Sequence, residues 1–149
     1  MKILKYLMIC FSVLFVLTGC TNNKKEVITL NKDNIEKYFI ITNSIDDYSV
    51  DTSRTIVGNT YRGYATLKIT LKPKYTISVN DVVIKGEVKL SEVVWSSSYN
   101  PMVSFEIQLD KDGNGEYTKN LTASQSIIRP EKPSVYEINF TEISGSIEK

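Results

Sequence analysis

Residues 65–72 read ATLKITLK and residues 103–109 read VSFEIQL. In both stretches, apolar and polar residues alternate. A period of two puts every apolar side chain on one face of a β-strand, whereas a helix would scatter the same residues around its axis. We therefore predict two half-buried strands, each with one face toward a core and one toward water.

Two further apolar runs change phase within their length. Between residues 75 and 90, apolar residues stand at odd positions before Asn80-Asp81 and at even positions after it. A one-residue slip would send every later side chain to the wrong face, so we predict a bulge or turn at this dipeptide. A similar change separates Phe140 from Ile143. We interpret both as bends by which strands pass from one sheet to the other.

Frequent turn signals set the fold class. Their positions are Asp46-Asp47, Gly58-Asn59, Lys72-Pro73, Asn100-Pro101, 113–115 and 130–133. They leave room for seven or eight short strands, which is typical of an antiparallel β-sandwich. One short helix is predicted over 31–39, with Asp33 and Glu36 as a capping box. We predict a mainly β protein, with residues 27–149 forming a β-sandwich domain and the short helix near its N-terminus.

The first twenty residues, MKILKYLMICFSVLFVLTGC, have a different character. Lys2 and Lys5 precede an uncharged, largely apolar run over residues 6–17. A membrane-spanning helix needs about 20 apolar residues, so this run is too short to be a comfortable span. It has the length of the apolar region of a signal peptide. The sequence Leu17-Thr18-Gly19-Cys20 follows directly.

This order of features resembles the lipobox of bacterial lipoproteins; the alternative is an uncleaved N-terminal anchor. The resemblance implies that the thiol of Cys20 receives a diacylglycerol and that a peptidase cleaves between Gly19 and Cys20. Residues 1–19 would be the signal peptide, and residues 20–26 the lipidated cysteine and its tether. The implied location is the extracytoplasmic face of a cell membrane, with the lipid bilayer as partner. A composition rich in Lys, Asn, Ile and Tyr suggests an AT-rich genome and favours a Gram-positive host.

The strand pattern after the tether is similar to the immunoglobulin-like sandwiches of small bacterial lipoproteins. The similarity is one of architecture, because the chain has no Cys-Trp-Cys pattern of the kind found in antibody domains.

Composition excludes several kinds of chemistry. The 149 residues include no histidine, and both cysteines, Cys10 and Cys20, lie within the first twenty. Ser-His-Asp and Cys-His mechanisms are therefore excluded, as are histidine-ligated metals and cysteine clusters. Basic and acidic residues number 18 and 17, so the chain presents no basic field for nucleic acid.

The segment Asp110-Lys111-Asp112-Gly113-Asn114-Gly115-Glu116 is the strongest metal motif. It matches the beginning of a calcium-binding EF-hand loop, in which alternate oxygen ligands converge on one ion. The candidate ligands are Asp110, Asp112, Asn114 and Glu116. Position twelve, which should be a bidentate glutamate, is Leu121. The competing interpretation is a β-hairpin turn in which Gly and Asn supply positive φ angles.

Aromatic residues offer candidate contacts for a partner. The stretch 95–101 reads WSSSYNP, a composition used by adaptable binding loops. We predict Trp95 in the core, since it ends a strand, and Tyr99 as a candidate exposed contact. Tyr61 and Tyr64, in the densest tyrosine cluster of the chain, are further candidates.

These observations favour a membrane-anchored, non-enzymatic binding or structural module of the cell envelope. Its partner would be an envelope protein or polymer, and no cofactor is expected beyond the lipid on Cys20. A small-ligand or Ca²⁺-binding lipoprotein is the alternative. A carboxylate-dependent enzyme is a weaker one, because Asp46-Asp47 and Asp51 lie in a polar, turn-like stretch without signs of raised pKa values.

Overall fold

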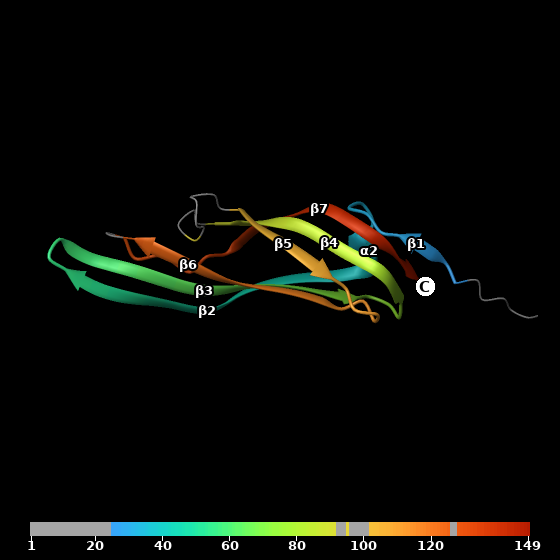
Figure 1. The fold of residues 1–149 in the computed structure, drawn as a ribbon, viewed down its shortest axis with the longest axis horizontal. Coiled ribbons are helices and arrows are strands. Elements are labelled where there is room, and N and C mark those ends of the chain that lie inside the picture. Colours follow the sequence, from blue (N-terminus) through green and yellow to red (C-terminus); the bar gives the residue numbers. More distant parts are fainter. Residues whose placement is uncertain (1–24, 92–94, 96–101, 126–127) are drawn as a thin grey trace, which may run out of the picture.

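The computed structural model describes residues 25–91, 95, 102–125 and 128–149. They form a mainly β structure of two antiparallel sheets packed face to face (Figure 1). One sheet has the strand order β1-β7-β4-β5 and the other has the order β2-β3-β6. The elements are β1 (Val27–Thr29), α2 (Ile35–Tyr38), β2 (Phe39–Thr55), β3 (Gly58–Pro73), β4 (Ser78–Leu90), β5 (Met102–Gln108), β6 (Gly115–Gln125) and β7 (Val135–Glu148).

The core lies between the sheets and is built mainly from alternate residues of β3, β4 and β5. On β3 the buried side chains are those of Ala65, Leu67, Ile69 and Leu71, and the residues between them face outward. Strand β5 buries three alternate residues in the same manner. No polar or charged side chain is buried among the described residues. Each fully buried aliphatic side chain contributes about 1.5–3 kcal/mol to folding, so this interior is the main source of stability.

The predicted irregularity at Asn80-Asp81 is present and is a bulge. The pairing of β4 with β7 shifts register between Asn80 and Val83, and Asp81 has a φ of 47°. Gly145 lies opposite with a φ of +95°, where an added Cβ would come within 2.5 Å of the Asp81 carbonyl oxygen. The extra residue restores the phase, so Val82 and Ile84 point into the core.

The change of phase near residue 140 also corresponds to a bulge. Lys85 pairs with Glu142, whereas the next residue, Gly86, pairs with Phe140, so Thr141 is the extra residue. The interpretation that these bends carry strands between sheets is wrong, because β4 and β7 each stay within one sheet. Bulges correct the side-chain phase without moving the strand out of its sheet.

The predicted helix is shorter than expected, and its start is stabilised differently. It covers Ile35–Tyr38, and its N-cap residue, Asn34, makes no capping hydrogen bond with its side chain. The Asn31 side-chain oxygen accepts hydrogen bonds from the amides of Asp33 and Asn34, at 2.9 and 3.1 Å. The predicted capping box at Asp33 is therefore replaced by a turn centred on Asn31. Ile35 is buried and anchors the helix to the core.

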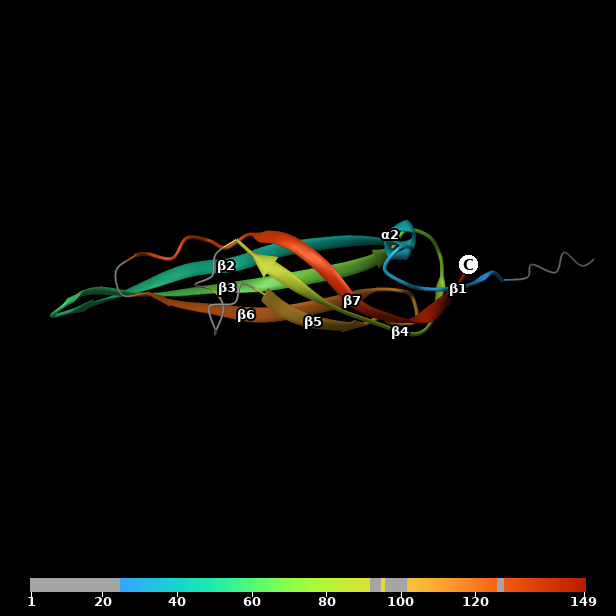
Figure 2. The same cartoon turned by 90° about the horizontal axis from the view of Figure 1, so that it is seen from above.

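Strand β2 is longer than its sequence suggests. Asp46-Asp47 lies inside the strand as a bulge, with Asp47 at a φ of 51°, and is not the predicted turn. The strand continues to Thr55, which pairs with Gly58, so the turn falls on Ile56-Val57 instead of Gly58-Asn59. Figures 1 and 2 show the resulting β2–β3 hairpin extending past the strands of the other sheet.

The strand order differs from that of immunoglobulin domains. In those domains the second and third strands belong to different sheets, whereas here β2 and β3 form a hairpin within one sheet. The likeness is therefore limited to the sandwich architecture. No helix in the part of the chain that the structure describes is long and apolar enough to cross a membrane.

A packed corner closes the sandwich where the hairpin leaves it. Trp95 is 1% exposed, which confirms its predicted core position, and its indole N–H donates to the carbonyl oxygen of Glu131 at 2.9 Å. The Tyr48 hydroxyl donates to the carbonyl oxygen of Pro130 at 2.6 Å. Gly63 provides space for the indole, because a Cβ there would lie 2.6 Å from a Trp95 ring carbon.

The variant Gly63→Ala should destabilise the protein by about 1–3 kcal/mol, the usual cost of overpacking a core. The added methyl would force the Trp95 ring away from the sheet. Urea denaturation gives the free energy of unfolding. Ser124→Ala, an exposed change opposite Arg62, should stay within about 0.5 kcal/mol of the parent. Equal stability of Gly63→Ala and the parent would contradict this role of Gly63.

Candidate functional site

The loop predicted as a calcium site or hairpin turn connects β5 to β6, which belong to different sheets. It is therefore a crossover between the sheets, and the β-hairpin interpretation is wrong. The Asp110 carboxylate closes the loop by accepting hydrogen bonds from the backbone amides of Asp112 and Asn114, at 2.9 and 2.8 Å. Gly113 has a φ of +85°, so glycine supplies the positive φ angle that was expected.

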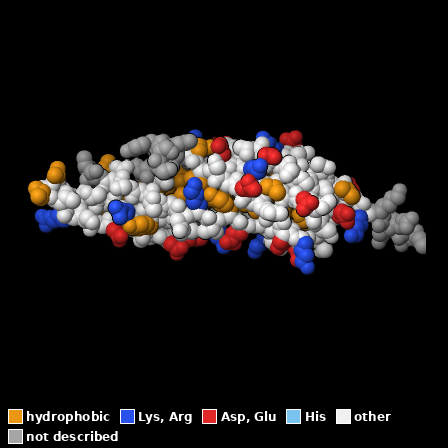
Figure 3. Space-filling model, viewed as in Figure 1, with side chains coloured by type: hydrophobic (Ala, Val, Ile, Leu, Met, Phe, Trp, Pro, Cys, Tyr) orange, Lys and Arg blue, Asp and Glu red, His pale blue; other side chains and the backbone are white. Residues whose placement is uncertain are grey.

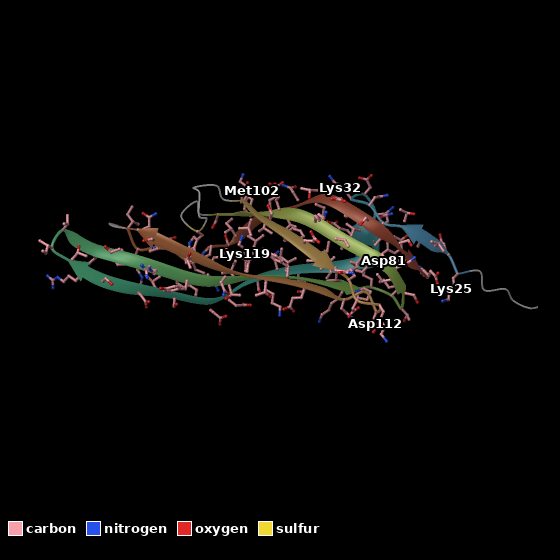
Figure 4. The ribbon with its side chains drawn as sticks, viewed as in Figure 1. Lys25, Lys32, Asp81, Met102, Asp112 and Lys119 are labelled. Carbon is pink, nitrogen blue, oxygen red and sulfur yellow. The ribbon has the colours of Figure 1, made fainter. Side chains whose placement is uncertain are left out.

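Two of the four candidate calcium ligands are engaged with donors of this chain. Asp110 is engaged with the amides of its own loop, and Glu116 forms an ion pair with Lys68 at 2.8 Å. Leu121, at the position of the bidentate glutamate, is buried in the core. Asp112 lies toward the end of the sandwich that holds Asp81, away from the β2–β3 hairpin turn (Figure 4). The described residues contain no group of three acidic residues placed to hold a metal ion.

Hydrogen bonding shifts the pKa values of two of these carboxyls. The pKa of Asp110 is lowered, chiefly by the backbone amide of Asn114. The pKa of Glu116 is lowered, chiefly by its hydrogen bond from Lys68. Both groups therefore remain ionised, and each is already paired with a donor from this chain.

Tyr61 and Tyr64, the two described tyrosine candidates, do not share one face of the sheet. Tyr61 and Tyr64 lie on β3, where residues three apart point to opposite faces. The Tyr61 hydroxyl accepts a hydrogen bond from the Asn59 side chain at 3.3 Å. Tyr99 lies outside the described residues, as do Gly19 and Cys20, so the roles predicted for these three residues stay predictions.

The turn of the β2–β3 hairpin is a surface that sequence reasoning missed. Ile56 is 106% exposed and Val57 is 97% exposed, more than any other large apolar side chain described. The turn is held by the pairing of Thr55 with Gly58, and the Thr55 hydroxyl donates to the Gly58 carbonyl oxygen at 2.7 Å. We call residues 54–58 the hairpin tip. The missed signal was an aliphatic pair preceding glycine within a polar stretch.

Arginines gather toward the same end of the molecule. The chain has three, Arg54, Arg62 and Arg129, and all three are exposed. Arg54 belongs to the hairpin tip. Arg62 and Arg129 directly precede Gly63 and Pro130, and these two residues lie together at the Trp95 corner, where a Cβ on Gly63 would be 3.4 Å from the Pro130 Cβ. The ion pairs in the described ranges all use lysine, so no described carboxylate pairs with an arginine. Figure 3 shows apolar and basic side chains together at the end of the hairpin.

Comparison with protein families, with curated proteins and with solved structures finds no match for this chain. The functional interpretation therefore depends on the residues and their geometry.

Calcium titration by calorimetry should give no saturable heat up to millimolar Ca²⁺, because two of the four candidate ligands are engaged and the fifth expected ligand is Leu121. Asp110→Ala should give the same flat titration. A saturable heat in the parent that disappears in Asp110→Ala would show that the loop rearranges around the ion.

The Asp110 carboxylate should make stability dependent on pH. Its pKa is lower in the folded protein, so its contribution is present above the unfolded pKa and is lost as pH falls through the folded value. Asp110→Asn should lower the urea midpoint at pH 7, and its difference from the parent should close in acid. Asp112→Asn, at a neighbouring exposed residue, is the control. A gap that stays constant with pH would contradict a charge effect.

Proposed function

We propose that the chain is a lipid-anchored lipoprotein of the bacterial cell envelope whose β-sandwich is a non-enzymatic binding or structural module. The observation that supports this proposal is the order of sequence features before the domain. Two lysines, an apolar run of signal-peptide length and Leu17-Thr18-Gly19-Cys20 follow one another without a gap. The lipid would be attached to Cys20, and the domain would lie on the extracytoplasmic face of a cell membrane, with a Gram-positive host favoured.

The start of the domain suits such an anchor. Glu26 and Lys149 exchange backbone hydrogen bonds of 3.2 and 3.0 Å, and Lys25 pairs with Glu148 at 3.2 Å. The described contacts therefore begin at Lys25, five residues after Cys20. Five residues reach at most about 17 Å, so a lipid on Cys20 would keep the β1 end of the sandwich close to the bilayer.

The arrangement of acidic groups favours a binding or structural role over catalysis. Asp46 and Asp47 are exposed on a bulge, and the Asp46 carboxylate accepts a hydrogen bond from the Ser44 hydroxyl at 2.9 Å. General acid–base catalysis by carboxyls requires two groups that face one substrate with separated pKa values. The Asp110 and Glu116 carboxyls, whose pKa values are both lowered, are held by the chain's own donors. An envelope protein or polymer is the partner that we propose.

Replacement of Cys20 tests the anchor. Cys20→Ala should abolish incorporation of a clickable palmitate analogue and leave the precursor mass, because no thiol would be available for the thioether. Cys10→Ala is the matched control, since Cys10 lies within the proposed signal peptide and should be dispensable. Mass spectrometry and metabolic labelling in a bacterial host measure both outcomes.

A Cys20→Ala protein that is still labelled, or a parent that keeps residues 1–19, would contradict the lipoprotein assignment. Labelling that is lost in Cys10→Ala and retained in Cys20→Ala would instead identify the first cysteine as the modified residue.

A further inference from the structure

We propose that the hairpin tip, residues 54–58, inserts into the interface of an anionic phospholipid bilayer. Ile56 and Val57 would enter the acyl boundary, and the arginines at this end would contact lipid phosphates. The inference goes beyond the proposed anchor, because it concerns the opposite end of the molecule from β1 (Figure 1). It does not depend on modification of Cys20.

The residue types at the tip are unusual for its exposure to water. Turn residues are most often Gly, Pro, Asn, Asp or Ser. The positive φ next to this turn is adopted by Gly58, at 137°, so the backbone of Ile56 and Val57 is not strained and the unusual feature is their apolar character. Asn59 and Gly58 stand immediately after the turn, yet the tip positions belong to Ile56 and Val57. Two adjacent aliphatic side chains that are held in water gain nothing from packing within the chain. Here the gain must come from something outside the chain, since both side chains are fully exposed.

The shape of the tip favours a deformable partner. The hairpin extends beyond the other sheet, so its end protrudes from the body of the sandwich (Figure 2). A protein partner would need a matching cavity, whereas a bilayer accommodates a protruding aliphatic pair without one. The ladder pairs Thr55↔Gly58 and Arg54↔Asn59 satisfy backbone groups up to the turn. Most of the inserted backbone would therefore remain hydrogen-bonded in a medium that penalises open amides.

Charge complementarity selects an anionic surface. Between Thr52 and Tyr61 the only charged side chain is Arg54. Arg62 faces Asp51 across the hairpin, but the two form no ion pair within 4 Å. Arginine is suited to phosphate because its planar group donates two parallel hydrogen bonds. A phosphate-bearing polymer would satisfy the arginines but leave Ile56 and Val57 in water, so a bilayer accounts for both features.

Site-specific fluorescence tests the proposal on the full chain. Val57→Trp is reconstituted into vesicles of phosphatidylglycerol or of phosphatidylcholine, each with brominated acyl chains. Trp95 is buried and gives the background, which the parent protein measures. Tyr136→Trp is the matched control, because Tyr136 is 72% exposed on β7. We expect the Val57→Trp emission to shift to the blue and to be quenched in phosphatidylglycerol, with no quenching at residue 136.

Two changes within the Val57→Trp background separate insertion from the affinity of tryptophan for membranes. Ile56→Asp should weaken partitioning of the tip by roughly tenfold or more, the loss expected when a buried aliphatic side chain is removed. Arg54→Gln should reduce the preference for phosphatidylglycerol over phosphatidylcholine. Both variants change exposed side chains, so the folded state should persist, and circular dichroism checks it.

Equal quenching at residues 57 and 136, or none at residue 57, would overturn the proposal. A photo-crosslinker at residue 57 that yields a protein adduct in cells, without lipid quenching in vesicles, would overturn it in favour of a protein partner. Labelling of Cys20 is measured separately, so failure of the tip proposal and failure of the lipoprotein assignment are distinguishable.

Discussion

The burial of alternate side chains between two sheets is the constraint on which the rest of this structure depends. Strand β3 runs through the middle of its sheet and contributes Leu67 and Ile69, both fully buried, to the shared interior. A strand that slipped by one residue would turn its apolar face to water. The bulges of β4 and β7 follow from this requirement, since Asp81 and Gly145 adopt unusual backbone angles to keep later residues in phase.

The same constraint explains why the hairpin tip is unusual. Near the Trp95 corner the interior is sealed by Gly63, Pro130 and the hydrogen bonds to the 130–131 backbone. Beyond that corner β2 and β3 continue as a ribbon whose residues 51–59 are all exposed. Residues in this ribbon contribute little to the core, so selection there is free to serve contacts outside the chain. The exposed aliphatic side chains of Ile56 and Val57 at its tip are therefore not required by the core.

The two proposals place membrane contacts at opposite ends of the sandwich. The tether would hold the β1 end within about 17 Å of the bilayer, and the tip lies at the far end of the β2–β3 hairpin (Figure 1). A domain held at both ends by one membrane would lie along its surface and expose one side to the envelope. Ion pairs on the outer faces, such as Lys85 with Glu142 at 3.1 Å, are exposed and contribute little to stability.

The sequence by itself determined the fold class, the strands over 65–71 and 103–109, the irregularity at Asn80-Asp81 and the buried position of Trp95. These follow from side-chain periodicity, which is local and can be read along the chain. Only the tertiary structure decided the strand order, the crossover at 110–114 and the position of the hairpin turn. Register and sheet membership depend on which strands pair. The register of β2 with β3, which begins at Phe39↔Pro73, places Thr55 opposite Gly58 and so leaves Ile56 and Val57 exposed at the turn.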